Sequence, residues 1–269
     1  MISVIAPNLN DAPYLRIFLD SLVAQTFKDF ELIIIDGGST DGSLDLLAKY
    51  ARRLRLKVLT DMRRNFGYLR NLGASYATGA IMLHCNTDNY LEPQLLEKLY
   101  HLYKVHPNVV SIGGRVYPIG TSLFAHLGYQ AFDFLRFLFT IAPMPIKKYR
   151  PSGNFMSIRS DVFWHVGGHP EVRANEDGLL GQKLDTYVSH HKQVMFSLNL
   201  YMGHYMRKFE QMGGLNAILF YFYVLGNFAP ILQPLLKHVL INAELVFEHK
   251  PHLQRLTLRQ VLTNLWHWL

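Results

Sequence analysis

The first 115 residues alternate between short apolar runs and segments whose apolar residues recur at helical spacing. The apolar runs predict strands at Ile2–Ala6, Leu32–Ile35, Leu56–Thr60, Ala80–His84 and Val109–Gly113. The segments between them predict helices at Tyr14–Ala24, Asp41–Leu54, Tyr68–Ala77 and Glu92–Val105. Because strands that alternate with helices form βαβ units with right-handed crossovers, the pattern predicts an α/β fold. Its sheet should be mostly parallel, Rossmann-like and flanked by helices.

The second half of the chain breaks this rhythm. Residues 120–145 are rich in Phe, Leu and Tyr, and residues 152–200 return to a mixed composition typical of an enzyme. Residues 211–236 contain no Asp, Glu, Lys, Arg or His, and their length is sufficient to cross a bilayer. This segment is compatible with interfacial or re-entrant helices, with a buried helical hairpin, or with a membrane span. Residues 253–269 are amphipathic, as expected for a helix at a membrane interface or one packed on the core.

Composition narrows the choice of partners. Of the 269 residues, 49% are hydrophobic and 17% charged, which predicts a sizeable core. The net charge of +7 at pH 7 is compatible with nucleic acid, anionic lipid or a phosphate-bearing substrate. Lys and Arg occur in scattered pairs, which favours a membrane surface or a pyrophosphate over nucleic acid. Cys85 is the single cysteine, so a disulfide within the chain and a cysteine metal cluster are excluded.

Residues 31–42, ELIIIDGGSTDG, combine a buried strand with polar residues at its end. The apolar part ends on Asp36, and two glycines follow it. Ligands of open α/β sheets bind at the carboxyl ends of the strands, so Asp36 is placed to accept a hydrogen bond from a uracil or guanine N–H. Gly38 would let the backbone approach the ligand closely. The alternative is a turn that ends the strand and caps the next helix through Ser39 or Thr40.

Three further blocks carry polar residues in the same kind of position. Pro7 and Asn8 follow the first predicted strand and are candidates to frame a base or ribose. The second block contains Asn65-x-Gly67, Arg70-Asn71-x-Gly73 and, at the end of the fourth strand, Asn86-Thr87-Asp88. The third contains Gly153-Asn154, an apolar strand that ends in Arg159, Val166-Gly167-Gly168 and Glu176-Asp177.

Together these blocks resemble the inverting glycosyltransferases of family 2, which use nucleotide sugars and have the GT-A fold. The resemblance covers about residues 1–208 and rests on the order and spacing of the motifs. It implies donor-binding roles for Pro7, Asn8, Asp36, Gly38, Asn65, Arg70, Asn86 and Thr87. It also implies that Gly153, Asn154 and Arg159 lie on the acceptor side.

The resemblance further implies a metal and a base. Asp88 would hold Mg²⁺ or Mn²⁺ on the donor pyrophosphate, with His204 as a candidate second ligand. Asn86 stands where the family usually has the first acid of Asp-x-Asp, so we expect a weaker metal affinity. Asp177, next to Glu176, would be the general base that deprotonates the acceptor hydroxyl. The alternative for this pair is that both carboxylates complement the dipole of the helix that they begin.

The resulting expectation is a glycosyltransferase that takes a nucleoside-diphosphate sugar, with UDP favoured, and a saccharide or lipid-linked acceptor. We expect a GT-A domain over 1–208, with a nucleotide-sugar half (1–115) and an acceptor half (116–208). Residues 209–269 would form an apolar helical segment that meets a membrane or pairs two chains as a homodimer. The expected location is cytoplasmic and peripheral on the inner face of the membrane. Transfer to a polyprenyl phosphate and a non-catalytic, membrane-associated nucleotide-sugar-binding protein are the alternatives.

Overall fold

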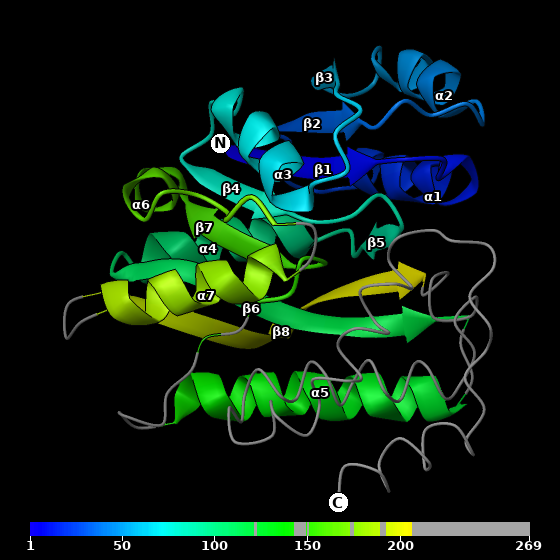
Figure 1. Cartoon of the computed structure of the whole chain (residues 1–269). Coiled ribbons are helices and arrows are strands. Elements are labelled where there is room, and N and C mark those ends of the chain that lie inside the picture. The colour runs from blue at the N-terminus through cyan, green and yellow to red at the C-terminus, as the bar shows by residue number, and fades with distance from the viewer. Residues whose placement is uncertain (121–122, 143–148, 150, 173–174, 189–191, 206–269) are drawn as a thin grey trace, which may run out of the picture. The chain divides into compact units, whose positions relative to one another are not determined.

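The computed structural model describes residues 1–205 apart from 121–122, 143–148, 150, 173–174 and 189–191 (Figure 1). The predicted segments 211–236 and 253–269 therefore lie outside the described residues. The chain divides into two compact units, of which the first comprises Met1–Ile119 and Asp133–Tyr205. Within the described ranges, none of the helices has the length and hydropathy needed to cross a membrane.

The elements follow the predicted alternation. In chain order they are β1 (Ile2–Asn8), α1 (Ala12–Val23), β2 (Phe30–Asp36), α2 (Ser43–Tyr50), β3 (Leu56–Thr60), α3 (Phe66–Ser75), β4 (Ile81–His84), β5 (Asn89–Leu91), α4 (Leu95–Val105), β6 (Val109–Ile119), α5 (Leu123–Ile141), β7 (Met156–Arg159), α6 (Ser160–His165), α7 (Glu176–Tyr187) and β8 (Gln193–Tyr205). The largest departures from prediction are β5, which we did not expect, and β6, which continues six residues beyond Gly113. The predicted strand stopped at the glycine pair 113–114, whereas the observed strand continues through it with a register shift after Gly114.

The strands form one eight-stranded sheet in the order β3-β2-β1-β4-β7-β6-β8-β5. β7 runs antiparallel to both of its neighbours and β5 runs antiparallel to β8, whereas the remaining pairs are parallel. The predicted α/β class with a mostly parallel sheet is therefore confirmed. Because β7 is reversed, its amino end meets the carboxyl ends of β1, β2 and β4 at one edge of the sheet, where all of the site described below lies.

The central strands are apolar along their whole length because both faces of the sheet are covered. The residues of β1, β2 and β4 are all buried, as is typical of parallel strands packed between helices. On one face, α3, α6 and α7 contribute to a core cluster with the strands, to which Leu69, Phe163 and Leu180 belong. Figure 1 shows α4 behind the sheet and α3 and α7 in front of it. This packing fixes α3 and α7 side by side over the edge where β4 ends.

A buried carboxylate connects the strands at their other ends, where β1, β2 and β4 begin. Glu31 Oε1 accepts hydrogen bonds from Ser3 Oγ at 2.7 Å, from Thr78 N at 2.7 Å and from Thr78 Oγ1 at 2.8 Å. Burial favours the neutral acid, but these hydrogen bonds together outweigh it and lower the pKa of Glu31. The carboxylate thus joins β1, β2 and the turn before β4 at a point remote from the site.

Candidate active site

Asp36 lies at the carboxyl end of β2, directly beside Asn8 at the end of β1. Its Oδ1 accepts the backbone N–H groups of Gly38 and Ser39 at 2.9 and 2.8 Å. Its Oδ2 accepts Ser39 Oγ at 2.6 Å and Asn8 Nδ2 at 2.7 Å. A carboxylate has about four lone-pair positions, so the chain's own donors occupy them. Asp36 is also fully buried, and it therefore shapes the loop that Gly38 (φ 87°) turns.

Asn8, unlike Asp36, has an acceptor atom that the described residues do not use. Its Oδ1 is buried and has no hydrogen-bond partner among the described residues. The amide orientation follows from its surroundings, since Nδ2 donates to the Asp36 carboxylate and to Ser39 Oγ. The flipped amide would direct an oxygen at a carboxylate, which is repulsive. Asn8 Oδ1 is therefore a buried acceptor at this edge that the N–H of a ligand could satisfy.

Thr87 and Asn86, which follow β4, make hydrogen bonds to different parts of the protein. Thr87 is buried and donates to Asp11 Oδ2 at 3.0 Å and to Pro7 O at 3.4 Å, so its hydroxyl ties β4 to β1. Asn86 is half-buried, and its Nδ2 donates to Asn154 Oδ1 at 2.6 Å. Asn86 therefore connects the end of β4 with the turn before β7.

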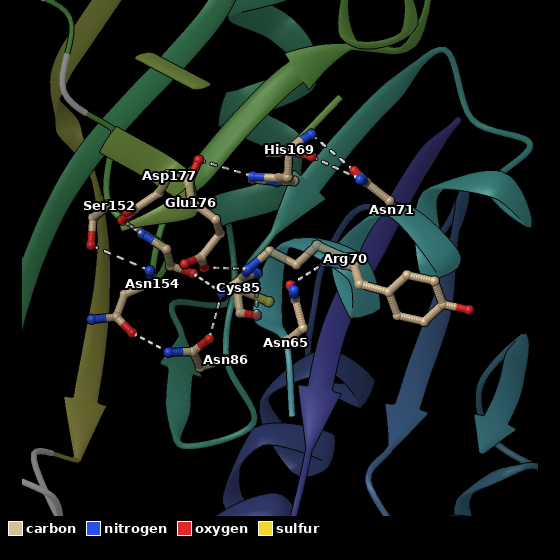
Figure 2. Close-up of polar contacts among 12 residues, drawn as sticks. Asn65, Arg70, Asn71, Cys85, Asn86, Ser152, Asn154, His169, Glu176 and Asp177 are labelled. Atoms are coloured by element: carbon tan, nitrogen blue, oxygen red, sulfur yellow. Dashed lines mark hydrogen bonds and ion pairs between the residues drawn. The ribbon is translucent and has the colours of Figure 1, made fainter. Parts of the chain in front are cut away.

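Arg70 in α3 occupies the centre of the site (Figure 2). Its side chain is almost entirely buried and forms an ion pair with Glu176 through Nε and Oε1 at 3.2 Å. Nη1 donates to Cys85 O at 3.1 Å, and Nη2 donates to Asn86 Oδ1 at 2.8 Å and to Gly153 O at 2.9 Å. One guanidinium thus links four segments that are far apart in the sequence.

Glu176 and Asp177 form the first turn of α7, where negative charge is favoured by the helix dipole. Asp177 is half-buried, and its Oδ2 accepts the backbone N–H of Gly153 at 2.5 Å. Glu176 is buried behind it. Burial and the neighbouring Asp177 charge raise the pKa of Glu176 to about 7, although Arg70 acts in the opposite direction. The pair therefore combines one enclosed carboxyl group with one that solvent reaches.

Two buried histidines lie behind this pair and were not among the residues expected at the site. The His84 ring stacks on Phe163 with centroids 5.2 Å apart and meets His169 edge-on at 4.8 Å. Within the described part of the chain, neither His84 nitrogen has a hydrogen-bond partner, and nor does His169 Nε2. Burial lowers the pKa of His169 to about 3, aided by Arg70, and burial lowers the pKa of His84 as well. Both rings are therefore neutral.

Asp88 and His204 lie together, as the expected metal ligands should. Asp88 Oδ1 and His204 Nδ1 are 3.3 Å apart, because Asn89 pairs with His204 between β5 and β8. The described residues hold no cluster of three or more His, Cys, Asp or Glu side chains suited to a metal. His204 Nδ1 also faces Asn89 Oδ1 at 3.0 Å and therefore donates, so a cation would need the other nitrogen of the ring. The Asp88 carboxylate with that nitrogen would fit a Mg²⁺ or Mn²⁺ ion that takes its other ligands from phosphate and water.

Two expected site residues have other surroundings. Asn65 caps α3, since its side chain accepts the backbone N–H of Tyr68 at 2.9 Å. Arg159 pairs with Ile81 at the start of β4 and is therefore at the opposite end of β7 from the site. Its guanidinium donates to the backbone oxygens of Val109 and Tyr103. The structure does not bring Arg159 to the acceptor side, because β7 runs antiparallel to β4, and the sequence carried no signal of this reversal.

Comparison with known proteins identifies relatives of this arrangement. The family model described as "Glycosyl transferase family 2" matches residues 3–167. The PGL/p-HBAD biosynthesis glycosyltransferase of Mycobacterium tuberculosis is 41% identical over 93 residues, which is 34% of this chain and 36% of that protein. The cholesterol galactosyltransferase of Borreliella burgdorferi is 36% identical over 104 residues, covering 38% of this chain and 29% of that protein. The matched region thus spans about a third of the length of these curated relatives.

Solved structures share the fold. S. aureus TarS 1–349, solved in complex with UDP-GlcNAc, has a TM-score of 0.59 at 19% identity, covering 98% of this chain and 78% of that one. The mannosyltransferase PcManGT of Pyrobaculum calidifontis, in complex with GDP-Man and Mn²⁺, has a TM-score of 0.63 at 16% identity, with 99% and 79% covered. At such identities the likeness concerns the fold alone, and it confirms the predicted GT-A architecture.

Proposed function

The chain belongs to glycosyl transferase family 2, and we propose that it moves a sugar from a nucleoside-diphosphate sugar to a hydroxyl group of a saccharide or lipid-linked acceptor, with inversion at the anomeric carbon. One observation carries the proposal. The half-buried Asp177 carboxylate is held by Gly153 at the same sheet edge as Asn8 and Asn86. This placement supports a base and donor-binding side chains within one site.

The donor half of the proposal rests on the ends of β1, β2 and β4. Asn8 Oδ1 is an unpaired acceptor among the described residues, suited to the imide N–H of uracil or to an N–H of guanine. Pro7 and Gly38 would flank the base, and Asp36 would hold the loop in place. UDP is favoured over GDP. TarS complexes with UDP-GlcNAc support this choice, whereas the PcManGT complex contains GDP-Man.

The chemical step rests on Asp177. In an inverting transfer the acceptor oxygen attacks the anomeric carbon from the face opposite the nucleotide, and a base takes its proton. Asp177 Oδ2 is oriented by the Gly153 N–H and Oδ1 by the Gly178 N–H at 2.7 Å. This orientation suits a group that receives a proton.

Asp88 and His204 are the residues that would hold Mg²⁺ or Mn²⁺. When bound, the cation would offset the negative charge that builds up on the departing nucleoside diphosphate. The PcManGT complex with Mn²⁺ supports the choice of metal.

The acceptor is proposed to be presented at a membrane surface on the cytoplasmic side. The net charge of +7 and the uncharged segment 211–236 support this part of the proposal. The cholesterol galactosyltransferase among the relatives also supports it, since its name specifies a lipid acceptor. A homodimer through the segment 209–269 is compatible with the same composition.

The test is nucleotide release from a panel of UDP-, GDP- and dTDP-sugars, with Mn²⁺, Mg²⁺ or EDTA, for wild type, Asp177→Asn and the exposed control Asp45→Asn. We expect release from one class of donor that requires metal and falls about 10³-fold in Asp177→Asn, since a positioned base contributes roughly 10²–10⁴-fold. Asp45→Asn should match wild type. Transfer to polyprenyl phosphate that Asp177→Asn leaves unchanged would contradict the base. Binding without release, with membranes added, would indicate a non-catalytic protein.

A further inference from the structure

The guanidinium of Arg70 is used almost completely by the protein itself. Arg has five N–H donors, and four of them are engaged by Glu176, Cys85, Asn86 and Gly153. The side chain is 2% exposed, so solvent does not share these contacts. A donor molecule could receive at most the one remaining N–H.

Two of these contacts lead directly to atoms that would face the substrates. Gly153 accepts from Arg70 through its carbonyl and donates its N–H to Asp177 Oδ2, so the position of one residue links Arg70 to the base. Asn86 accepts from Arg70 and donates to Asn154 at 2.6 Å. Arg70 therefore has few atoms left to contact a donor or an acceptor. It holds Gly153, which orients Asp177, and it holds Asn86, as Figure 2 shows for the labelled residues.

A planar fork is needed for such an arrangement. Nε and the two Nη atoms lie in one plane and point at four separate acceptors, which the flexible point charge of a lysine cannot reproduce. Burying an ion pair is costly unless geometry and additional hydrogen bonds compensate. The four bonds of Arg70 supply this compensation, and they do so only while α3, the end of β4, the turn at Gly153 and α7 keep their relative positions.

We propose that Arg70 is a positioning residue that holds Asp177 and Asn86 in register, and not a residue that binds the donor sugar nucleotide. This inference rests on the proposed function and deepens it. The two roles of Arg70 can be told apart by kinetics. Loss of a donor contact weakens nucleotide binding, whereas loss of positioning lowers kcat. The donor-binding role that the family resemblance implied for Arg70 predicts the first result.

The experiment compares Arg70→Lys with Arg136→Lys, a second fully buried arginine that pairs with Asp133 at 2.6 Å in α5. For Arg70→Lys we expect kcat to fall about 100-fold, the loss typical of a misplaced reacting group. The donor KM and the Kd of the nucleoside diphosphate should stay within about threefold of wild type. Arg136→Lys should lower Tm about as much as Arg70→Lys does, but it should leave kcat unchanged. A rise in donor Kd that matches the fall in kcat/KM would overturn the proposal.

A second variant disturbs the same register without removing a charge. A Cβ at Gly153 would lie 3.1 Å from Arg70 Nη2, so Gly153→Ala pushes the guanidinium by a few tenths of an ångström, whereas Asp177 Oδ2 at 3.4 Å would be in ordinary contact. We expect a fall in kcat of about tenfold with unchanged nucleotide Kd. Gly113→Ala is the matched control, since its Cβ would meet Phe196 at an ordinary 3.5 Å. Equal kcat in the two alanine variants would refute the positioning role, even if Arg70→Lys fails to fold.

Amide hydrogen exchange separates this inference from the proposed function. The Gly153 N–H is protected by Asp177, and we expect its exchange to accelerate more than tenfold in Arg70→Lys but not in Arg136→Lys. If no donor is turned over by wild type, the proposed function fails, and the exchange result alone decides whether Arg70 positions the turn. Unchanged exchange at Gly153 in folded Arg70→Lys would overturn the proposal in either case.

Discussion

The buried histidine pair makes folding stability depend on pH in a way that one substitution can isolate. His84 is fully buried, its ring lies against Phe163 and His169, and neither of its nitrogens has a partner among the described residues. Replacing it with leucine removes a titrating group without leaving a described polar neighbour unpaired. We therefore expect His84→Leu to fold and to alter the pH dependence of stability.

The magnitude follows from proton binding. Burial keeps the pKa of both His84 and His169 below its ordinary value, so the folded protein holds neither proton at pH 5.5. The unfolded chain binds both below about pH 6.5, and the free energy of unfolding therefore falls as pH decreases. Between pH 7.5 and 5.5 each histidine contributes a loss of about 1.4 kcal/mol, or about 2.7 kcal/mol for two. His84→Leu should lose about 1.4 kcal/mol less than wild type over this interval.

The assay is urea unfolding followed by far-ultraviolet circular dichroism at pH 5.5, 6.5 and 7.5. Glu176, whose raised pKa of about 7 stabilises the folded state as pH falls through this window, is present in both proteins and cancels in the comparison. His101→Gln, on the exposed face of α4, serves as the control and should follow wild type. If wild type and His84→Leu lose equal stability between pH 7.5 and 5.5, the assignment of His84 as a buried neutral group is refuted.

Four further outcomes test other parts of the structure. Glu31→Ala should lower the free energy of unfolding by about 2 kcal/mol because the buried Ser3 hydroxyl and two part-buried donors of Thr78 lose their acceptor, and urea unfolding measures this. Because the pKa of Glu31 is lowered in the folded protein, its stabilising effect is lost in acid. The difference in free energy of unfolding between wild type and Glu31→Ala should therefore shrink as pH falls below about 4, where the unfolded carboxyl group protonates. Gly67→Ala should abolish folding or cost more than about 4 kcal/mol, because its Cβ would overlap the carbonyl oxygen of Pro170; expression and Tm report it. Asn8→Ala should raise the donor Kd about tenfold by removing the unpaired acceptor, as calorimetric titration with the nucleoside diphosphate would show. Asp88→Ala should abolish metal-dependent stimulation while leaving Tm within a few degrees, and full stimulation by Mn²⁺ in this variant would contradict the assignment.

The alternation of elements was predictable because it depends on local apolar periodicity. Buried parallel strands such as Leu32–Ile35 read as continuous apolar runs, and the helices between them have clear amphipathic spacing. The direction of β7 was not predictable in this way. A strand of four residues carries no signal of orientation, and its antiparallel pairing with β4 is seen only in the structure. Arg159 was consequently expected at the wrong end of the strand.

The polar residues of the site were predictable as a set, but their partners were not. Asp36 and Arg70 both read as ligand contacts because each lies in a polar motif near a strand end. In the structure the protein occupies the acceptor positions of Asp36 with residues on β1 and the adjoining loop, and it occupies four of the five Arg70 donors, one of them by Glu176, 106 positions away. Contacts of such separation have no periodic signature, and the same applies to the pairing of His84 with His169. Sequence motifs identify which residues gather at the edge, whereas burial and hydrogen bonding decide which of them face a ligand.

The hydrogen-bond partners of Asn86 explain why an amide suits this position. An amide both accepts and donates, and Asn86 uses its oxygen for Arg70 Nη2 and its nitrogen for Asn154 Oδ1. A carboxylate at this position could accept from Arg70 but would face the Asn154 oxygen without a proton to donate. It would also compete with Glu176 for the one guanidinium charge, which would push the Glu176 carboxyl group further toward its neutral form. An amide at this position is therefore consistent with a site in which Arg70 is committed to Glu176, and Asp88 would then be the carboxylate of this strand end that holds the proposed metal.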